Sequence, residues 1–351
     1  MGKELMVNKQ RLQEILSRLP GLRIIVFGDY FLDNYLILDR SLSETSLETG
    51  LEAYQVIKTR KYPGVAGVVT ANLRALGVDV VALGLVGDDG NGYDLRNRLV
   101  ESGIDVSGFL QIPAYDTPTY NKPMMREPDG EEHELNRLDV KPRAPLPASL
   151  EDRLIAEMNR ALPQADGMLV VDQARSLNCG VVTDRVREEL QRLAVAHPGK
   201  ILVADSRDFL GRYASVILKA NLSEALRAAQ VTRAAEESAA ECADRCGRIL
   251  CGRTNRPVII TLGEEGIYLR ERLDRPGSVL PAIPVSGPID IVGAGDSVNA
   301  AMGAALCAGA MLNEAAFLGN LVASVVIQQI GVTGTATPAQ LLEQYKTHFE
   351  T

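Results

Sequence analysis

The chain alternates short apolar runs with amphipathic stretches, and this alternation limits the folds that it can adopt. Three of the apolar runs end in an aspartate, at Asp29, Asp172 and Asp205. Continuous apolar runs are typical of parallel strands buried on both faces, and the amphipathic stretches between them are typical of helices that cover such a sheet. The sequence therefore predicts an α/β fold with a central, mostly parallel sheet covered by helices on both faces.

Two more polar parts of the chain depart from this pattern. Residues 34–62 and 107–140 contain short alternating pieces that are separated by prolines and acidic residues. Such pieces favour the strands of a half-exposed sheet. We expect one domain over residues 1–351, into which residues 34–62 and 107–140 insert a small β-sheet lid.

Composition and charge exclude several classes of protein. A net charge of −8 argues against a surface for nucleic acid or for an anionic membrane. The apolar stretches are too short or too rich in alanine and glycine to span a bilayer, and the first residues lack a secretory signal, so we expect a cytoplasmic location. Cys242, Cys246 and Cys251 are expected to be small buried side chains rather than metal ligands.

The strongest chemical signal lies in residues 290–299, which read Asp-Ile-Val-Gly-Ala-Gly-Asp-Ser-Val-Asn. Gly293 and Gly295 have no Cβ, so the backbone can approach a bound anion, and the first amides of the helix that follows lack an intrahelical acceptor. Such amides stabilise negative charge on a transferring phosphoryl group. Asp296 would accept the proton of an attacking alcohol, although the helix start is expected to lower its pKa.

Taken alone, this run also has a local explanation, as a glycine turn followed by an acidic residue in the first turn of a helix. Other nucleotide motifs are missing. The chain contains no Gly-x-x-x-x-Gly-Lys-Ser/Thr, and no Gly-x-Gly-x-x-Gly follows its first apolar run. These absences argue against a P-loop kinase and against a dinucleotide-dependent oxidoreductase.

A set of motifs in fixed order resembles the ribokinase-like (PfkB) carbohydrate kinases, with the heptose 7-phosphate kinases as the nearest likeness. The motifs are Gly28-Asp29 with Asp33, Pro63-Gly64, Leu76-Gly77, Arg137-Leu-Asp139, Asp205-Ser-Arg207, Asn221-Leu-Ser-Glu224, Thr261-Leu-Gly-Glu-Glu-Gly266 and the run at residues 290–296. They cover nearly the whole chain. The resemblance implies a ribokinase-like fold and ATP-dependent phosphoryl transfer to a hydroxyl of a sugar or sugar phosphate.

The resemblance assigns catalytic and cofactor roles to particular residues. Asp296 would be the base, and Gly293, Ala294 and Gly295 would stabilise the transferring phosphate. Asn221 and Glu224 would hold Mg²⁺, mostly through water, although Asn at a helix start with Glu three residues later is also a capping box. The residues expected to contact ATP are Asn221, Glu224, Thr261, Gly263, Gly266 and Asn320. As an ordinary hairpin, the run from Thr261 to Gly266 would need no ligand.

The acceptor sugar is expected at the carboxyl ends of the strands, where ligands of open α/β sheets collect. The residues expected to contact it are Asp29, Asp33, Gly64, Lys122, Arg137 and Asp172. Lys122 and Arg137 would neutralise a phosphate on the sugar. Turn aspartates and solvated basic side chains are the alternatives.

Four apolar residues depart from the family pattern and keep other functions open. Val65 replaces the second glycine of a Gly-Gly pair, Val68 falls where an asparagine holds substrate, and Ile291 and Val292 stand where threonine or a small polar residue is common. Either the substrate differs from that of the family or the substrate pocket has a different shape. A kinase-like regulatory protein that binds nucleotide or sugar with little turnover is therefore the alternative, and a structural dimerisation module is a third reading.

The resemblance implies two further partners. Asp290 lies where some members of the family bind a monovalent cation. A homodimer through the small sheet is expected, because the exposed face and edges of such a sheet need cover.

Overall fold

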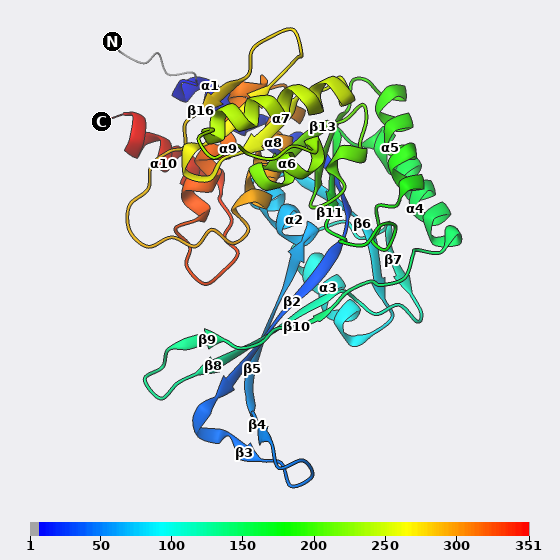
Figure 1. The fold of residues 1–351 in the computed structure, drawn as a ribbon, viewed down its shortest axis with the longest axis vertical. Helices are drawn as coiled ribbons and strands as arrows, with labels where there is room; N and C mark the ends of the chain where they lie inside the picture. Colours follow the sequence, from blue (N-terminus) through cyan, green and yellow to red (C-terminus); the bar gives the residue numbers. More distant parts are fainter. Residues whose placement is uncertain (1–6, 351) are drawn as a thin grey trace.

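A nine-stranded sheet forms the centre of the protein (Figure 1) in the computed structural model, which describes residues 7–350. Its strands are β1 (Arg23–Gly28), β6 (Asp79–Gly87), β7 (Phe109–Ile112), β11 (Gly167–Asp172), β12 (Ile201–Ser206), β13 (Ile217–Asn221), β14 (Val258–Thr261), β15 (Ile267–Arg270) and β16 (Ser278–Leu280). The spatial order is β16-β15-β14-β13-β12-β11-β1-β6-β7. All neighbours from β14 to β7 pair in parallel, and β15 pairs antiparallel with β14 and β16. The predicted, mostly parallel sheet is confirmed.

Helices cover both faces of this sheet, as predicted. One face packs against α1 (Lys9–Arg18), α2 (Ala66–Ala75), α3 (Gly90–Glu101), α8 (Ala294–Cys307), α9 (Leu312–Val326) and α10 (Pro338–Phe349), and the other against α4 (Ala148–Ala161), α5 (Asp184–Ala196), α6 (Leu222–Ala229) and α7 (Ala239–Thr254). Alternate side chains of β1 face opposite sides of the sheet: Ile24 and Val26 join one apolar core, and Ile25 and Phe27 join the other. Each face therefore needs helices to cover it. Burying each such side chain contributes about 1.5–3 kcal/mol.

Three cysteines of α7 lie inside the second core. Cys242, Cys246 and Cys251 are all buried there, which agrees with their expected role as small apolar side chains. Within residues 7–350, no helix combines the length and the apolar composition needed to cross a bilayer.

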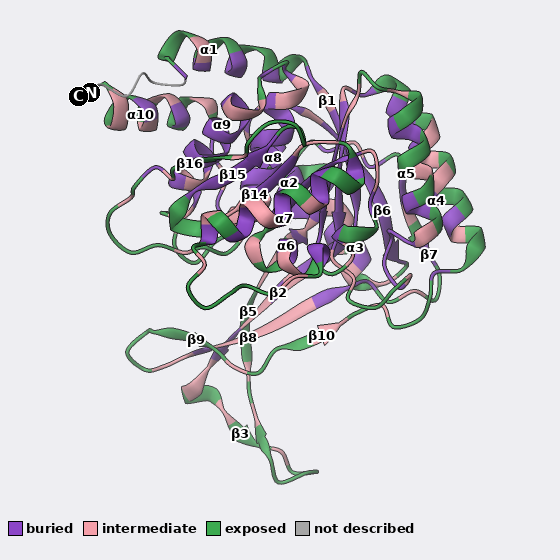
Figure 2. Ribbon diagram, turned by 45° about the horizontal axis from the view of Figure 1, so that its top comes forward, coloured by how far each residue is buried: buried purple, intermediate pink, exposed green. Residues whose placement is uncertain are grey.

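A second, five-stranded sheet projects from the body as an arm (Figure 1). It consists of β2 (Tyr30–Asp39), β5 (Val56–Val65), β8 (Thr119–Arg126), β9 (Glu132–Glu134) and β10 (Leu138–Val140), and the short strands β3 (Glu44–Thr45) and β4 (Glu52–Ala53) pair at its tip. Strand β2 is central, antiparallel to β5 and parallel to β8. Figure 2 shows an arm that is largely exposed or half-buried, whereas the strands of the large sheet are buried.

One part of the predicted small sheet lies elsewhere. Strand β7, which was expected in the lid because it falls within residues 107–140, pairs in parallel with β6 at the edge of the large sheet. Its apolar side chains explain this position: Phe109 and Ile112 are buried, and the ring of Phe109 meets the ring of Tyr30 edge to face at 4.9 Å. The second of the two segments that form the small sheet therefore begins after β7, with β8.

Val65 joins β5 to α2 in a conformation that valine rarely adopts. Its φ is +58° and its ψ is −112°. For a β-branched residue a positive φ is a steric outlier, and strain of this kind costs about 1–3 kcal/mol. The surroundings enforce it, because Val65 pairs with Tyr30 across the sheet while the amide of the next residue, Ala66, donates to the carbonyl of Asp29 at 3.2 Å.

This geometry predicts an inverted order of stability for two substitutions. At ordinary positions alanine is more stabilising than glycine by about 0.5–1 kcal/mol. At position 65 glycine accepts the positive φ without strain, so Val65→Gly should be more stable than Val65→Ala by about 1 kcal/mol. Urea unfolding of both variants measures the difference. At Val195, an exposed residue of α5, the alanine variant should be more stable than the glycine variant. If the alanine variant is also the more stable one at position 65, the backbone there is not strained.

Candidate active site

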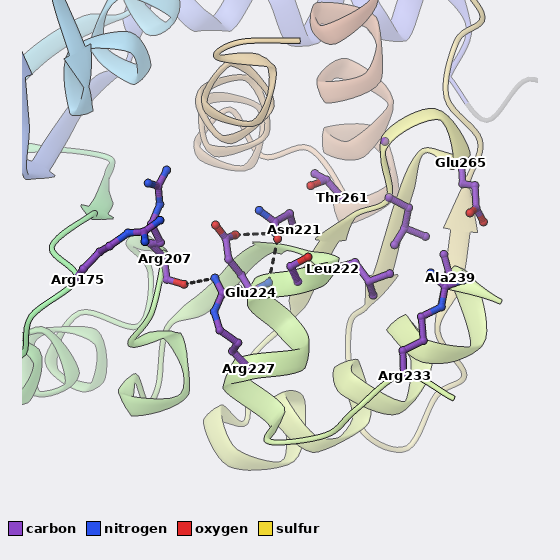
Figure 3. Close-up of a pocket in the computed structure, with 13 residues that line it drawn as sticks. Arg175, Arg207, Asn221, Leu222, Glu224, Arg227, Arg233, Ala239, Thr261 and Glu265 are labelled. Atoms are coloured by element: carbon purple, nitrogen blue, oxygen red, sulfur yellow. Dashed lines mark hydrogen bonds between the residues drawn. The ribbon is translucent and has the colours of Figure 1, made fainter. Parts of the chain in front are cut away.

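Four of the residues predicted to bind nucleotide meet at the carboxyl ends of β13 and β14, beside the end of β12. A cavity of about 620 Å³, here called the strand-end cavity, opens there (Figure 3). Its lining includes Asn221, Glu224, Thr261 and Gly263, which the sequence had placed at a nucleotide, together with Arg207. The parallel order of the strands produces this meeting, because it brings their carboxyl ends to one edge of the sheet.

The N-terminus of α8 has the bare backbone that its sequence predicted. Gly293 caps the helix with φ +79°, and a Cβ at this position would lie 2.7 Å from Cγ2 of Thr333 and 3.5 Å from Cγ1 of Val68. The amide of Ala294 donates to the carbonyl of Ile291 at 3.2 Å. Within the described residues, the amides of Gly295 and Asp296 have no backbone acceptor. These two amides are therefore the ones available to an anion.

The carboxylate of Asp296 differs from the sequence expectation in its acidity. The helix start was expected to lower its pKa, but the pKa is raised to about 7. Burial is the largest cause, the cations of Lys219 and Arg207 oppose it, and the carboxylates of Asp205 and Glu224 add to it. Desolvation thus outweighs the helix dipole, and Asp296 is a better proton acceptor near neutral pH than an ordinary aspartate.

Lys219 supplies a buried positive charge that the sequence analysis missed. It lies directly opposite Asp205 in the β12–β13 pairing, and its Nζ donates to Oδ2 of Asp205 at 2.6 Å. Both side chains are almost fully buried. Burial alone would lower the pKa of Lys219, but the carboxylates of Asp205, Asp296 and Glu224 outweigh it and raise that pKa. One signal was present: Lys219 is the only charged residue in the buried run Ile-Leu-Lys-Ala of β13.

Asn221 and Glu224 form the capping box that the sequence allowed as an alternative. The amide of Glu224 donates to Oδ1 of Asn221 at 2.9 Å, and the amide of Asn221 donates to Oε2 of Glu224 at 2.8 Å (Figure 3). Burial, followed by the charge of Asp205, raises the pKa of Glu224. The contacts occupy one carboxylate oxygen and leave Oε1 of Glu224 as an acceptor beside the strand-end cavity, which this residue lines.

The fit of this site to Mg²⁺ depends on hard oxygen donors. Within residues 7–350, no three carboxylate, imidazole or thiolate groups lie close enough to hold a metal ion directly. The amide oxygen of Asn221 and the carboxylate of Glu224 are the types of donor that Mg²⁺ accepts, and Mg²⁺ usually keeps several waters. The residues therefore fit an ion that is held through water and through ligand phosphates.

In the turn after β14, Gly263 is open to solvent space and Gly266 is closely packed. Gly263 has φ +63° and open space around its Cβ position, whereas a Cβ on Gly266 would lie 2.1 Å from the carbonyl oxygen of Leu280. Asn320 donates to the carbonyl of Pro281 at 2.9 Å. The hydroxyl of Thr261 donates to the carbonyl of Ala220 at 3.3 Å. Gly266 thus lets the turn pack against residues 280–282, Asn320 ties α9 to the same segment, and Thr261 and Gly263 line the cavity.

Asp29 was expected to bind the sugar, and in the structure its carboxylate binds backbone amides. Its carboxylate accepts the backbone amides of Gln173 and Val181 at 2.8 Å and of Ala174 at 3.0 Å, and the side chain is buried. Burial, followed by the charge of Asp172, raises the pKa of Asp29 to about 6. With both oxygens engaged, Asp29 anchors the loop after β11, and its predicted contact with the sugar stays a prediction.

Asp172 also makes internal contacts, although through one carboxylate oxygen only, and its predicted sugar contact stays a prediction. It is fully buried, and its Oδ2 accepts from Ser206 at 2.8 Å, from the hydroxyl of Tyr213 at 2.9 Å and from Arg187 at 3.1 Å. Its side chain points into the core between β11 and α5. The sequence predicted the strand end correctly but not the face to which the side chain turns.

The other acceptor residues lie on the small sheet. The carboxylate of Asp33 pairs with Nζ of Lys122 at 3.1 Å, and a Cβ on Gly64 would lie 2.7 Å from Oδ2 of Asp33. Glycine is therefore required at position 64 to leave room for this carboxylate. Arg137 pairs with Asp139 at 2.6 Å, so its charge is already compensated.

A second cavity, of about 470 Å³, lies between the small sheet and the ends of β11 and β12. We call it the cationic cavity, because Lys141, Arg143, Arg175 and Arg207 line it together with the stacked rings of Phe31 and Tyr120. Lys141 pairs with Asp139. Within the described residues, the three arginines form no ion pair, so their charges are free for an anionic ligand. Arg175 and Arg207 also line the strand-end cavity.

Comparison with known proteins agrees with this geometry. A family model described as pfkB family carbohydrate kinase matches residues 35–340. The bifunctional protein HldE of Caulobacter vibrioides is 32% identical over 338 residues, which are 94% of this chain and 65% of that protein. The bifunctional protein HldE of Campylobacter jejuni is 30% identical over 310 residues, which are 88% of this chain and 62% of that protein. The chain thus spans somewhat less than two thirds of the length of these relatives.

Solved structures show the same fold. A ribokinase of Arabidopsis thaliana, complexed with ribose and ATP, superposes with a TM-score of 0.65 at 17% identity and covers 93% of this chain and 99% of its own. The tetrameric inhibited form of phosphofructokinase-2 from Escherichia coli gives a TM-score of 0.68 at 18% identity, with coverages of 93% and 99%. The ribokinase-like fold is confirmed. From the match over residues 35–340, the chain belongs to the pfkB family of carbohydrate kinases.

Proposed function

We propose that the protein transfers the γ-phosphoryl group of ATP to a hydroxyl of a sugar that already carries a phosphate. The observation that carries this proposal is the position of Arg175 and Arg207, which line both the strand-end cavity and the cationic cavity. Two anionic ligands would therefore approach each other at these arginines. Family membership supports phosphoryl transfer to a sugar, and the ribokinase solved with ribose and ATP supports ATP as the donor.

The residues at the N-terminus of α8 would carry out the transfer. The acceptor hydroxyl gives its proton to Asp296, its oxygen bonds to the γ-phosphorus, and the bond from that phosphorus to the β–γ bridging oxygen breaks. The amides of Gly295 and Asp296 donate to the negative oxygens of the group in transit. Asn221 and Glu224 would hold Mg²⁺ through water, and the ion would neutralise the phosphates of the nucleotide.

The cationic cavity would bind the phosphate of the acceptor. Arginine binds phosphate through two parallel hydrogen bonds, and free guanidinium groups in a cleft are suited to this. Arg143 lines the cationic cavity but not the strand-end cavity, so it would distinguish the acceptor from the nucleotide. A phosphorylated heptose is the acceptor that the sequence resemblance suggests.

Three further expectations stay predictions. Asp290 accepts the amides of Val292 at 3.0 Å and Gly331 at 3.2 Å, and a monovalent cation is expected beside this junction. A homodimer through the small sheet is expected because Leu47 and Leu138 are exposed there. A cytoplasmic location is expected from the sequence.

A regulatory protein with little turnover is the second candidate, and one observation favours it. Cγ1 of Val68 lies 3.5 Å from the Cβ position of Gly293. By the sequence resemblance, position 68 is the one at which the family has an asparagine that holds the substrate. Ile291 and Val292, in contrast, are exposed and leave the N-terminus of α8 open. Release of ADP, measured against a panel of sugars and sugar phosphates, separates an enzyme from a regulator.

Replacement of the proposed base should abolish transfer without abolishing binding. Asp296→Asn keeps the shape of the side chain but removes the proton acceptor, so turnover should fall by about 100-fold or more. Calorimetric titration should show that the affinity for ATP changes little. A variant that turns over at the wild-type rate, with an unchanged melting curve, would reject Asp296 as the base.

The raised pKa of Asp296 predicts a pH dependence. Because Asp296 must be deprotonated to accept a proton, kcat/KM should decrease about tenfold per pH unit below its pKa of about 7. The same shift affects stability: the folded protein binds this proton more tightly than the unfolded chain, so the charge is destabilising above about pH 7.

Melting temperatures test whether the charge of Asp296 destabilises the folded protein. Asp296→Asn should melt at a higher temperature than the wild type at pH 8, and the difference should disappear between pH 7 and pH 4, where Asp296 becomes neutral in the folded protein. A constant difference across this range would contradict the raised pKa.

Substitution in the cationic cavity should affect the acceptor alone. Arg143→Gln should raise KM for a phosphorylated sugar about tenfold and leave kcat and the KM for ATP nearly unchanged, because it removes binding that ground state and transition state share. Arg272→Gln is the matched control, since Arg272 is exposed and pairs only with Asp274 within the described residues. An equal loss for the phosphorylated and the unphosphorylated form of one sugar would argue against this site.

A further inference from the structure

Two cations act on the carboxylate of Asp296 at the N-terminus of α8, Lys219 and Arg207, and Lys219 is the more deeply buried of the two. The carboxylates of Asp205, Glu224 and Asp296 all interact with the ammonium group of Lys219. Without that ammonium, Arg207 would be the remaining cation against the carboxylates of Asp205, Glu224 and Asp296 where the γ-phosphate is proposed to bind. Like charges repel each other more strongly in a partly buried site than in water.

Lys219 also reaches the bare backbone of α8. A Cβ on Gly295 would lie 3.4 Å from Nζ of Lys219, and no other described atom outside the first turns of α8 lies within 4 Å of that position. Gly295 therefore does more than free an amide, because it leaves the ammonium group facing the first turn of the helix. The charge of Lys219 thus lies beside the first turn of α8, where the amides of Gly295 and Asp296 have no backbone acceptor among the described residues.

The hydrogen-bonding capacity of Lys219 is only partly used. An ammonium group has three donors. Within the described residues, Oδ2 of Asp205 is its only hydrogen-bond partner, at 2.6 Å. Asp205 lies beside Lys219 on the neighbouring strand and is itself nearly buried, so it holds the long side chain in one direction. The remaining donors have no hydrogen-bond partner among the described residues.

We propose that Lys219 is a further catalytic residue, whose ammonium group binds an oxygen of the γ-phosphoryl group, and that Asp205 is its positioning residue. This inference rests on the proposed phosphoryl transfer. As the acceptor oxygen bonds to phosphorus and the bond to the β–γ bridging oxygen breaks, Lys219 keeps all its protons and stabilises the charge on the phosphoryl oxygens. The proton of the hydroxyl still passes to Asp296.

Nucleotide binding tests this assignment without any acceptor. In the presence of Mg²⁺, Lys219→Met should weaken binding of the β,γ-imido analogue of ATP by about tenfold or more, because a charged hydrogen bond is lost. Binding of ADP, which lacks the γ-phosphate, should change less than about twofold. A lysine with a purely structural role would affect both nucleotides equally.

Turnover provides the second measurement. Lys219→Met should lower kcat by about 100-fold, the usual effect of removing one donor to a developing charge. Lys200→Met is the matched control, since Lys200 precedes β12 at the opposite end of the sheet, and it should behave as the wild type. The double variant Lys219→Met/Asp205→Asn avoids an unpaired buried carboxylate and should show the same loss of preference for the ATP analogue.

The outcomes separate this inference from the proposed function. If the wild type binds the ATP analogue and Lys219→Met binds it equally well, Lys219 does not contact the γ-phosphate and the inference is overturned. An equal loss for ADP and the analogue, in the single and the double variant, also overturns it. If the wild type binds neither nucleotide, the proposed function itself fails.

Discussion

One buried ammonium group balances the charges at the centre of the proposed site. Lys219 stands among Asp205, Glu224 and Asp296, and its position follows from the pairing of β12 with β13. Burial of such a charge costs several kcal/mol, and only a close partner such as Asp205, at 2.6 Å, offsets that cost. The arrangement keeps one carboxylate paired and leaves Asp296 basic, so the two properties that phosphoryl transfer needs come from one cluster of charges.

The sequence predicted the elements and the strand ends well because these depend on local rules. Apolar runs that end in an acid predicted β1, β11 and β12, and their order predicted a parallel sheet with its polar residues at one edge. The same rules could not decide where each side chain turns. Asp29 turns to backbone amides, Asp172 turns to Arg187, and only Asp205 faces the site. That choice depends on neighbours distant in the sequence.

Two further differences have the same origin. The run Phe-Leu-Gln-Ile of β7 is too short to show by itself whether it joins the large or the small sheet, and its burial against Tyr30 decides the matter. The helix start at Asp296 predicted a lowered pKa, but the burial that raises it to about 7 depends on the whole fold. Val65 is a third case, because its place in the family pattern suggested a changed pocket, and its positive φ emerged only from the folded backbone.

Asp29 has a mechanical consequence beyond its hydrogen bonds. It lies between β1 and β2, so its backbone joins the rigid body to the central strand of the arm, and its carbonyl also accepts the amide of Ala66 at the start of α2. Its carboxylate, in turn, grips the loop that carries Arg175. A tilt of the arm would therefore shift Arg175 as well, and with it the lining of both the strand-end cavity and the cationic cavity.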